Sequence, residues 1–204
     1  MAKDQELEIK YFVKSLEPIR LRLELVGGKI IRPRVHEINY RFDTPERRLE
    51  QSFQVLRLRK DNEIRMTFKG PAIEKNGVRV RQEIEFKVNE LRSAQALLEA
   101  LDFQIVMMYE KYRTEYSFEE CHIALDELPF GLFVEIEGPD PTQIRAVNQL
   151  LGLDWDSRVS ESYVILFDRI KQVLNLKFRD LTFENFQQFG DLSRELNVNP
   201  ADQN

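Results

Sequence analysis

The feature that most constrains the fold is a strict alternation of charged and apolar residues near the start of the chain. Residues 6–11 read Glu-Leu-Glu-Ile-Lys-Tyr, so every second side chain is charged and those between are apolar. A period of two predicts a β-strand with one polar and one apolar face. On such a strand Glu6, Glu8 and Lys10 would stand in a row, about 6–7 Å apart.

The same alternation returns in five further stretches, at residues 56–59, 64–69, 78–88, 111–116 and 133–137. Together with Asp126, their charged faces and that of the first strand carry eight carboxylates and ten bases. A sheet with one apolar face buries that face against helices. If the sheet also closes, the charged faces converge on a shared interior. Because unpaired buried charge is costly, such an interior predicts a polyanion for the bases and a divalent metal for the carboxylates.

Composition and charge narrow the function classes. The net charge of −5 over 204 residues gives no overall basic field of the kind that binds nucleic acid. A single cysteine, Cys121, excludes an internal disulfide and suits a reducing compartment. The first residues lack the apolar core of a secretory signal, and no apolar stretch reaches membrane-spanning length. We therefore expect a cytoplasmic protein with a small-molecule partner, without nucleic-acid or membrane partners, and with a homodimer left open.

The remaining chain predicts helices between the strands. Helices are expected over residues 15–26, 89–101, 140–152 and from about residue 160 to 174, and strands at 35–43, 53–60, 63–69, 103–117, 119–127 and 131–138. The glycine-bearing segment 70–77 is expected to be a connector more than a mobile lid. Trp155 and Tyr163 are expected to pack near the junction of the last helices. The polar residues 191–204 predict a flexible tail.

The charged strand motifs follow one another in a fixed order. They are Glu6-x-Glu8-x-Lys10, Arg57-x-Arg59, Lys69 in Thr-Phe-Lys-Gly, Arg81-x-Glu83-x-Glu85, Lys111-x-Arg113, Asp126 and Glu135-x-Glu137-Gly138. This series resembles the signature of the CYTH superfamily, the triphosphate tunnel metalloenzymes, over about residues 6–170. The resemblance implies an α+β fold with a closed or nearly closed antiparallel eight-stranded β-barrel and helices outside. Residues 1–190 would form a single domain, in which residues 171–190 are a helical extension that packs on the barrel or on a second copy.

The resemblance also implies roles for the charged residues. The residues expected to bind substrate phosphates are Lys10, Arg57, Arg59, Lys69, Arg81, Lys111 and Arg113. The residues expected to hold metal are Glu6, Glu8, Glu83, Glu85, Asp126, Glu135 and Glu137. The candidates for a direct catalytic role are Lys10, Glu85 and Asp126. The metal would be Mg²⁺ or Mn²⁺, which prefer carboxylate oxygens and water.

The family includes class IV adenylyl cyclases, thiamine triphosphatases and inorganic tripolyphosphatases, so two reactions compete. In hydrolysis, water attacks a terminal phosphorus of tripolyphosphate, thiamine triphosphate or a nucleotide. In cyclisation, the ribose 3′-hydroxyl of ATP attacks the α-phosphorus and pyrophosphate leaves. Hydrolysis is favoured because no residue set in the sequence can be assigned to adenine. A non-catalytic polyphosphate or nucleotide-binding module is the third reading.

Overall fold

The computed structural model describes residues 5–202. Their strands are β1 (Gln5–Val13), β2 (Lys29–Asp43), β3 (Val55–Lys60), β4 (Ile64–Lys69), β5 (Ile73–Lys75), β6 (Val78–Val88), β7 (Gln104–Phe118), β8 (Cys121–Leu128) and β9 (Gly131–Glu137). Their helices are α1 (Glu17–Leu25), α2 (Arg48–Gln51), α3 (Leu91–Ala100), α4 (Pro141–Leu151), the 3₁₀-helix η1 (Trp155–Ser157), α5 (Tyr163–Leu174), α6 (Phe183–Phe186) and α7 (Ser193–Leu196). No helix among these residues is long and apolar enough to cross a membrane.

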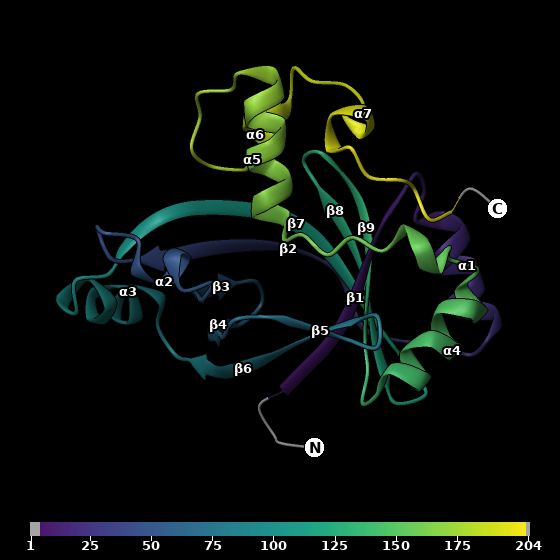
Figure 1. Ribbon diagram of the computed structural model, residues 1–204. Coiled ribbons are helices and arrows are strands. Elements are labelled where there is room, and N and C mark those ends of the chain that lie inside the picture. Colours follow the sequence, from purple (N-terminus) through teal and green to yellow (C-terminus); the bar gives the residue numbers. More distant parts are fainter. Residues whose placement is uncertain (1–4, 203–204) are drawn as a thin grey trace.

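Eight of the strands form a ring. Their order is β1-β9-β8-β7-β2-β3-β4-β6, and a pairing between β6 and β1 completes the circle (Figure 1). Every neighbouring pair is antiparallel. The predicted α+β class and nearly closed antiparallel arrangement are confirmed. The short β5, within the segment expected to be a connector, forms a hairpin with β6 outside the ring.

The strand register brings the predicted charged faces together. Lys10 of β1 stands opposite Glu135 of β9, and Glu6 of β1 stands opposite Arg81 of β6. Because side chains alternate along a strand, the residues two positions before and after each paired residue lie on the same side of the sheet as that residue. The charged alternation therefore faces the inside of the ring, and the apolar alternation faces the helices.

The helices α1, α3 and α4 cover the apolar outer face of the ring. Ile19 of α1 and Ile144 of α4 are completely buried in one cluster with the apolar residues of β1, β8 and β9. The helices α5, α6 and α7 bury a second cluster, rich in phenylalanine, against residues such as Phe12, Tyr109 and Phe133, which alternate in step with the charged residues and so lie on the inner face of the ring. The start of α4 matches the sequence signals, since the carboxylate of Asp140 accepts from the backbone N–H of Thr142 and Gln143. At α3 the cap is Glu90, one residue after the expected Asn89.

The C-terminal residues differ from the flexible tail that their polar composition predicts. Residues 193–196 form α7, and the backbone of Ala201 donates to the carbonyl of Phe12 at 2.9 Å and accepts from Asp154 at 3.0 Å. The carboxylate of Asp202 accepts from the backbone of Lys14 at 2.9 Å. These backbone bonds, with the burial of Leu196 and Ala201, offset the entropy of ordering a polar segment. The expectation for residues 203–204 lies outside the described part of the chain.

Candidate active site: a charged tunnel

The ring of strands encloses a cavity of about 1180 Å³, called the tunnel below. All eight strands of the ring contribute to its lining. Among the residues predicted from sequence to form the site, the lining includes Glu6, Glu8, Lys10, Arg57, Arg59, Lys69, Arg81, Glu83, Glu85, Lys111, Arg113, Glu135 and Glu137. The structure thus brings these residues into one cavity, and of the predicted site residues only Asp126, which stands opposite Arg113 on the same inward face, is absent from the lining, because other lining side chains cover it.

Carboxylates gather where β1, β6 and β9 meet. Glu6 accepts from the ammonium of Lys69 at 2.8 and 2.9 Å and from the Nε of Arg81 at 2.7 Å. Glu8 accepts from Arg81 at 3.1 Å. Although burial alone would raise the pKa of Glu6, the cations of Lys69 and Arg81 hold that pKa well below its usual range. Bases that could bind phosphate are therefore already paired with carboxylates that could bind metal.

In two further glutamates of this region, nearby cations do not offset the effects of burial and of neighbouring carboxylates on the pKa. The pKa of Glu137 is raised to about 7 by loss of water around its carboxyl group and by the nearby charges of Glu6 and Glu83. The pKa of Glu83 is raised for the same two reasons, although Lys69 lies 2.9 Å from it. The raised pKa values indicate that positive charge does not balance the carboxylates in this corner of the tunnel, and carboxylate oxygens suit Mg²⁺ or Mn²⁺. Within residues 5–202, no three potential ligands stand close enough together to hold a metal in the present arrangement, so a metal would have to displace the paired bases.

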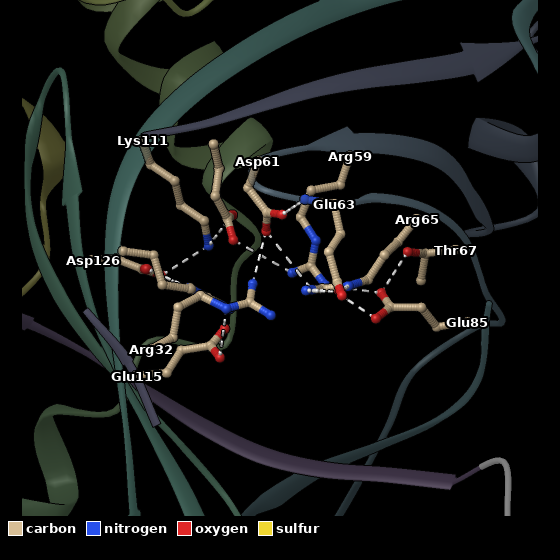
Figure 2. Close-up of polar contacts among 12 residues, drawn as sticks. Arg32, Arg59, Asp61, Glu63, Arg65, Thr67, Glu85, Lys111, Glu115 and Asp126 are labelled. Atoms are coloured by element: carbon tan, nitrogen blue, oxygen red, sulfur yellow. Dashed lines mark hydrogen bonds and ion pairs between the residues drawn. The ribbon is translucent and has the colours of Figure 1, made fainter. Parts of the chain in front are cut away.

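The opposite wall, from β2, β3 and β4, carries mainly arginines. Arg57 donates to the hydroxyl groups of Tyr109 at 3.2 Å and Thr67 at 3.3 Å, and its closest ion pair is with Glu85, at 3.7 Å. Arg59 donates to Glu85 at 3.0 Å, and Thr67 donates to the same carboxylate at 2.8 Å (Figure 2). Guanidinium groups held in this way present planar donor sets to the tunnel, which suits phosphate oxygens.

Asp126 is completely buried, and its carboxylate accepts hydrogen bonds from three neighbouring side chains. It accepts from Arg113 at 2.6 and 2.5 Å, from Lys111 at 3.0 Å (Figure 2) and from the hydroxyl of Tyr163 at 2.8 Å. Arg113 also reaches Glu135 at 2.5 Å. Asp126 therefore fixes two bases that line the tunnel, and these bases and Tyr163 screen its carboxylate from the cavity.

Sequence reasoning missed two charged residues of β2 that belong to the site. Glu37 is completely buried between Arg59 at 3.5 Å and Lys111 at 3.6 Å. Burial would raise its pKa, but Lys111, Arg113 and Arg59 lower it to about 2. Arg41 lines the tunnel opposite Arg57 in the strand register, and no ion pair links it to a carboxylate of the described residues. The signal was present, because residues 35–43 also alternate, but their charged positions were not assigned to the site.

Comparison with known proteins gives a family match. The CYTH domain matches residues 4–163. Among curated proteins, one named "Putative adenylate cyclase" from Methanocaldococcus jannaschii is 30% identical over 134 residues, covering 65% of this chain and 75% of that protein.

Solved structures share the fold. One described as a "putative adenylate cyclase" from Vibrio parahaemolyticus has a TM-score of 0.71 and 26% identity, over 85% of this chain and 99% of that one. A protein from Pyrococcus horikoshii has a TM-score of 0.66 and 25% identity, over 78% and 98%. A "putative adenylyl cyclase" from Hippeastrum, described as having a dominant triphosphatase activity, has a TM-score of 0.59 over 80% and 95%. At 18% identity that likeness shows the fold alone.

Proposed function

The chain belongs to the CYTH domain family, and on that premise we propose that it is a divalent-metal-dependent enzyme that hydrolyses a triphosphate inside the tunnel. The substrate class includes tripolyphosphate, thiamine triphosphate and nucleoside triphosphates. The observation that carries the proposal is the tunnel itself, in which a wall rich in arginine faces a corner rich in carboxylates within one cavity. A triphosphate bound to Mg²⁺ needs both surfaces at once.

The bases are assigned to the phosphate oxygens. These residues are Lys10, Arg57, Arg59, Lys69, Arg81, Lys111 and Arg113, and we add Arg41 because it lines the tunnel without an ion pair. Arginine can bind two phosphate oxygens through its planar fork, whereas lysine acts as a point charge. Phosphoryl transfer depends mostly on such positioning and charge neutralisation.

The carboxylates are assigned to the metal. Glu6, Glu8, Glu83 and Glu137 are the first candidates, because they crowd one corner and the pKa values of Glu83 and Glu137 are raised there. Glu85 and Glu135 remain candidates on the tunnel wall. When bound, Mg²⁺ or Mn²⁺ would neutralise charge on the phosphates and orient water. Of the proposed catalytic residues, Lys10 and Glu85 face the tunnel, whereas Asp126 acts through Lys111 and Arg113.

Cyclisation of ATP is the second candidate function, because the similar proteins from Methanocaldococcus jannaschii and Vibrio parahaemolyticus are each named "putative adenylate cyclase". Cyclisation would use the same phosphate-binding bases and the same metal. It would also need a site that holds adenine and ribose so that the 3′-hydroxyl is in line with the α-phosphorus. Hydrolysis needs only the phosphate-binding bases, the metal and an ordered water molecule. We therefore rank hydrolysis first.

A panel of triphosphates tests the proposal. Purified protein is incubated with tripolyphosphate, ATP or thiamine triphosphate, with Mg²⁺, with Mn²⁺ and with EDTA, and orthophosphate, pyrophosphate and cyclic AMP are measured. Hydrolysis predicts orthophosphate with either metal and none in EDTA. Cyclic AMP with pyrophosphate from ATP, and no turnover of tripolyphosphate, would support the cyclase. Tight binding of triphosphates without any product would support the non-catalytic binding module.

A further inference from the structure

Tyr163 places an aromatic ring against the tunnel. It is the first residue of α5, whose N-terminus is capped by the hydroxyl of Ser162. The side chain is buried, packs edge-on against Phe133, and contributes to the tunnel lining. The sequence pattern assigned Tyr163 only to packing between helices, so its contact with the tunnel adds to that role.

The ring of Tyr163 lies beside the ammonium of Lys10. The Nζ of Lys10 is 4.3 Å from the ring centroid and donates to the backbone carbonyl of Glu161 at 3.2 Å. Its only ion pair among the described residues is with Glu135, at 3.5 Å. The surroundings of Lys69 are different, because carboxylate oxygens of Glu6 and Glu83 lie 2.8 and 2.9 Å from its ammonium. Lys10 is thus held mostly by uncharged groups.

The nature of the partner decides how much charge a base can offer to a ligand. A carboxylate holds an ammonium group but cancels its field, so a phosphate must compete with that carboxylate. An aromatic face holds the ammonium group through the ring quadrupole and leaves its full charge in place. Lys10 is therefore fixed in position with little neutralisation, because its carboxylate partner, Glu135 at 3.5 Å, is held more closely by Arg113 at 2.5 Å.

We propose that Tyr163 is a positioning residue that holds the ammonium of Lys10 ready for a substrate phosphate. This inference rests on the proposed function, because it takes a phosphate group as the ligand of Lys10. The hydroxyl of Tyr163 contributes by donating to Asp126 at 2.8 Å, which fixes the orientation of the ring. The same ring lies 5.5 Å from the ammonium of Lys111, so its effect on Lys111 is weaker.

Substitutions separate the ring from the hydroxyl. Tyr163→Phe keeps the aromatic face and loses the bond to Asp126, whereas Tyr163→Leu loses both. The matched control is Tyr112→Leu, because Tyr112 packs against His36 and Phe183 and does not line the tunnel. The affinity for tripolyphosphate is measured by calorimetry in EDTA, and KM and kcat are measured with Mg²⁺.

The expected result is a graded loss of phosphate affinity. Tyr163→Leu weakens tripolyphosphate binding and raises KM by about 5- to 30-fold. Tyr163→Phe stays within about threefold of the wild type, and Tyr112→Leu leaves both constants unchanged. In a Lys10→Gln background, the further effect of Tyr163→Leu on affinity falls to within about threefold, because the ring acts mainly through the ammonium of Lys10. Equal losses in Phe and Leu variants, or a full loss from Tyr163→Leu in the Lys10→Gln background, would overturn the proposal.

A shape-matched pair covers the case in which Tyr163→Leu fails to fold. Phenylalanine and pentafluorophenylalanine at position 163 are similar in shape, but fluorination reverses the ring quadrupole. The fluorinated variant is expected to bind tripolyphosphate more weakly, and equal binding would contradict the proposal. Failure of the proposed function would look different, since the wild-type protein would then bind tripolyphosphate without hydrolysing it. The comparison of affinities among the variants would still decide the role of Tyr163.

Discussion

The ammonium of Lys69 lies 2.8 and 2.9 Å from the two carboxylate oxygens of Glu6, although their strands β4 and β1 are separated by β6. This pair reaches over β6 and joins a proposed phosphate-binding base to a proposed metal-binding carboxylate. A bound triphosphate would draw Lys69 away from Glu6, and a bound metal would draw Glu6 away from Lys69. The two ligands should therefore favour each other's binding.

Lys69→Met is predicted to raise the affinity for Mn²⁺ and to lower the affinity for tripolyphosphate. Without the ammonium, Glu6 is freer to bind Mn²⁺, so the affinity for Mn²⁺ in the absence of triphosphate should rise by about tenfold. The affinity for tripolyphosphate should fall by about tenfold or more, because a phosphate contact is lost. Electron paramagnetic resonance measures free Mn²⁺, and calorimetry in EDTA measures tripolyphosphate binding. Lys87→Met is the control, since Lys87 is exposed and pairs with Glu63. If both affinities fell, Glu6 would not be released from Lys69 to bind the metal, and the proposed exchange of Lys69 for metal at Glu6 would be contradicted.

Arg57→Ala is predicted to raise KM for tripolyphosphate by about 10- to 100-fold and to lower kcat, because Arg57 is held by neutral hydroxyl groups and is free to bind phosphate. Folding should be retained, since Arg57 stands opposite Arg41 and like charges on facing strand positions repel. Steady-state kinetics and thermal unfolding measure the two effects. Arg34→Ala removes a surface arginine that pairs with Glu127 and should leave the kinetics unchanged. Wild-type kinetics in Arg57→Ala would remove the basis for the phosphate-binding wall.

The ring of strands could be predicted because its signal is local. In residues 6–11 and 78–88, every second side chain is charged, and a period of two assigns each residue to a face. Facing positions then follow from the closure of the sheet, as in the pairing of Lys10 with Glu135. The same reasoning could not distinguish Asp126, which is covered by the side chains of Lys111, Arg113 and Tyr163, from a carboxylate exposed to the tunnel. That distinction depends on the position of Tyr163, which α5 brings from a distant part of the sequence.

Other features depend on contacts between distant parts of the chain. Glu37 lies in an alternating stretch, but its importance comes from Arg59 and Lys111 on the two neighbouring strands. The segment after α7 is polar in sequence, yet Ala201 is ordered by backbone bonds to Phe12 and Asp154. Composition reports the tendency of a segment to collapse by itself, and it carries no information about partners that another strand supplies.

Glu37→Gln is predicted to destabilise the protein at neutral pH by roughly 3 kcal/mol, with an effect that disappears in acid. The folded-state pKa of Glu37 is about 2, below the ordinary value of 4.5. A lowered carboxyl pKa contributes stability that is present above pH 4.5 and is lost as the pH falls towards 2. Urea unfolding of wild-type and variant protein between pH 7 and pH 3 measures the difference, which should shrink below pH 4.5. Glu127→Gln, which alters a surface pair with Arg34, should change stability by less than about 1 kcal/mol. A constant difference across this range would exclude the charge of Glu37 as its source.

Asp126→Asn is predicted to weaken triphosphate binding without raising the metal requirement. Asp126 is completely buried, and its oxygens accept from Lys111, Arg113 and Tyr163, so no oxygen is free for a metal in the tunnel. The asparagine keeps the shape but leaves two bases with less compensation, which should reduce stability by about 3–5 kcal/mol.

The concentration of Mn²⁺ that gives half-maximal activity separates this role from metal binding. Glu8→Gln, which changes a carboxylate in the acidic corner, should raise that concentration by about tenfold or more. Asp126→Asn should leave it within about threefold of the wild type, while KM for the triphosphate rises because Lys111 and Arg113 are less well fixed. Urea unfolding of Asp126→Asn is measured first, so that activity is compared only where the variant is folded. If Asp126→Asn raised the Mn²⁺ requirement as much as Glu8→Gln, Asp126 would have to leave Lys111 and Arg113 and bind the metal directly.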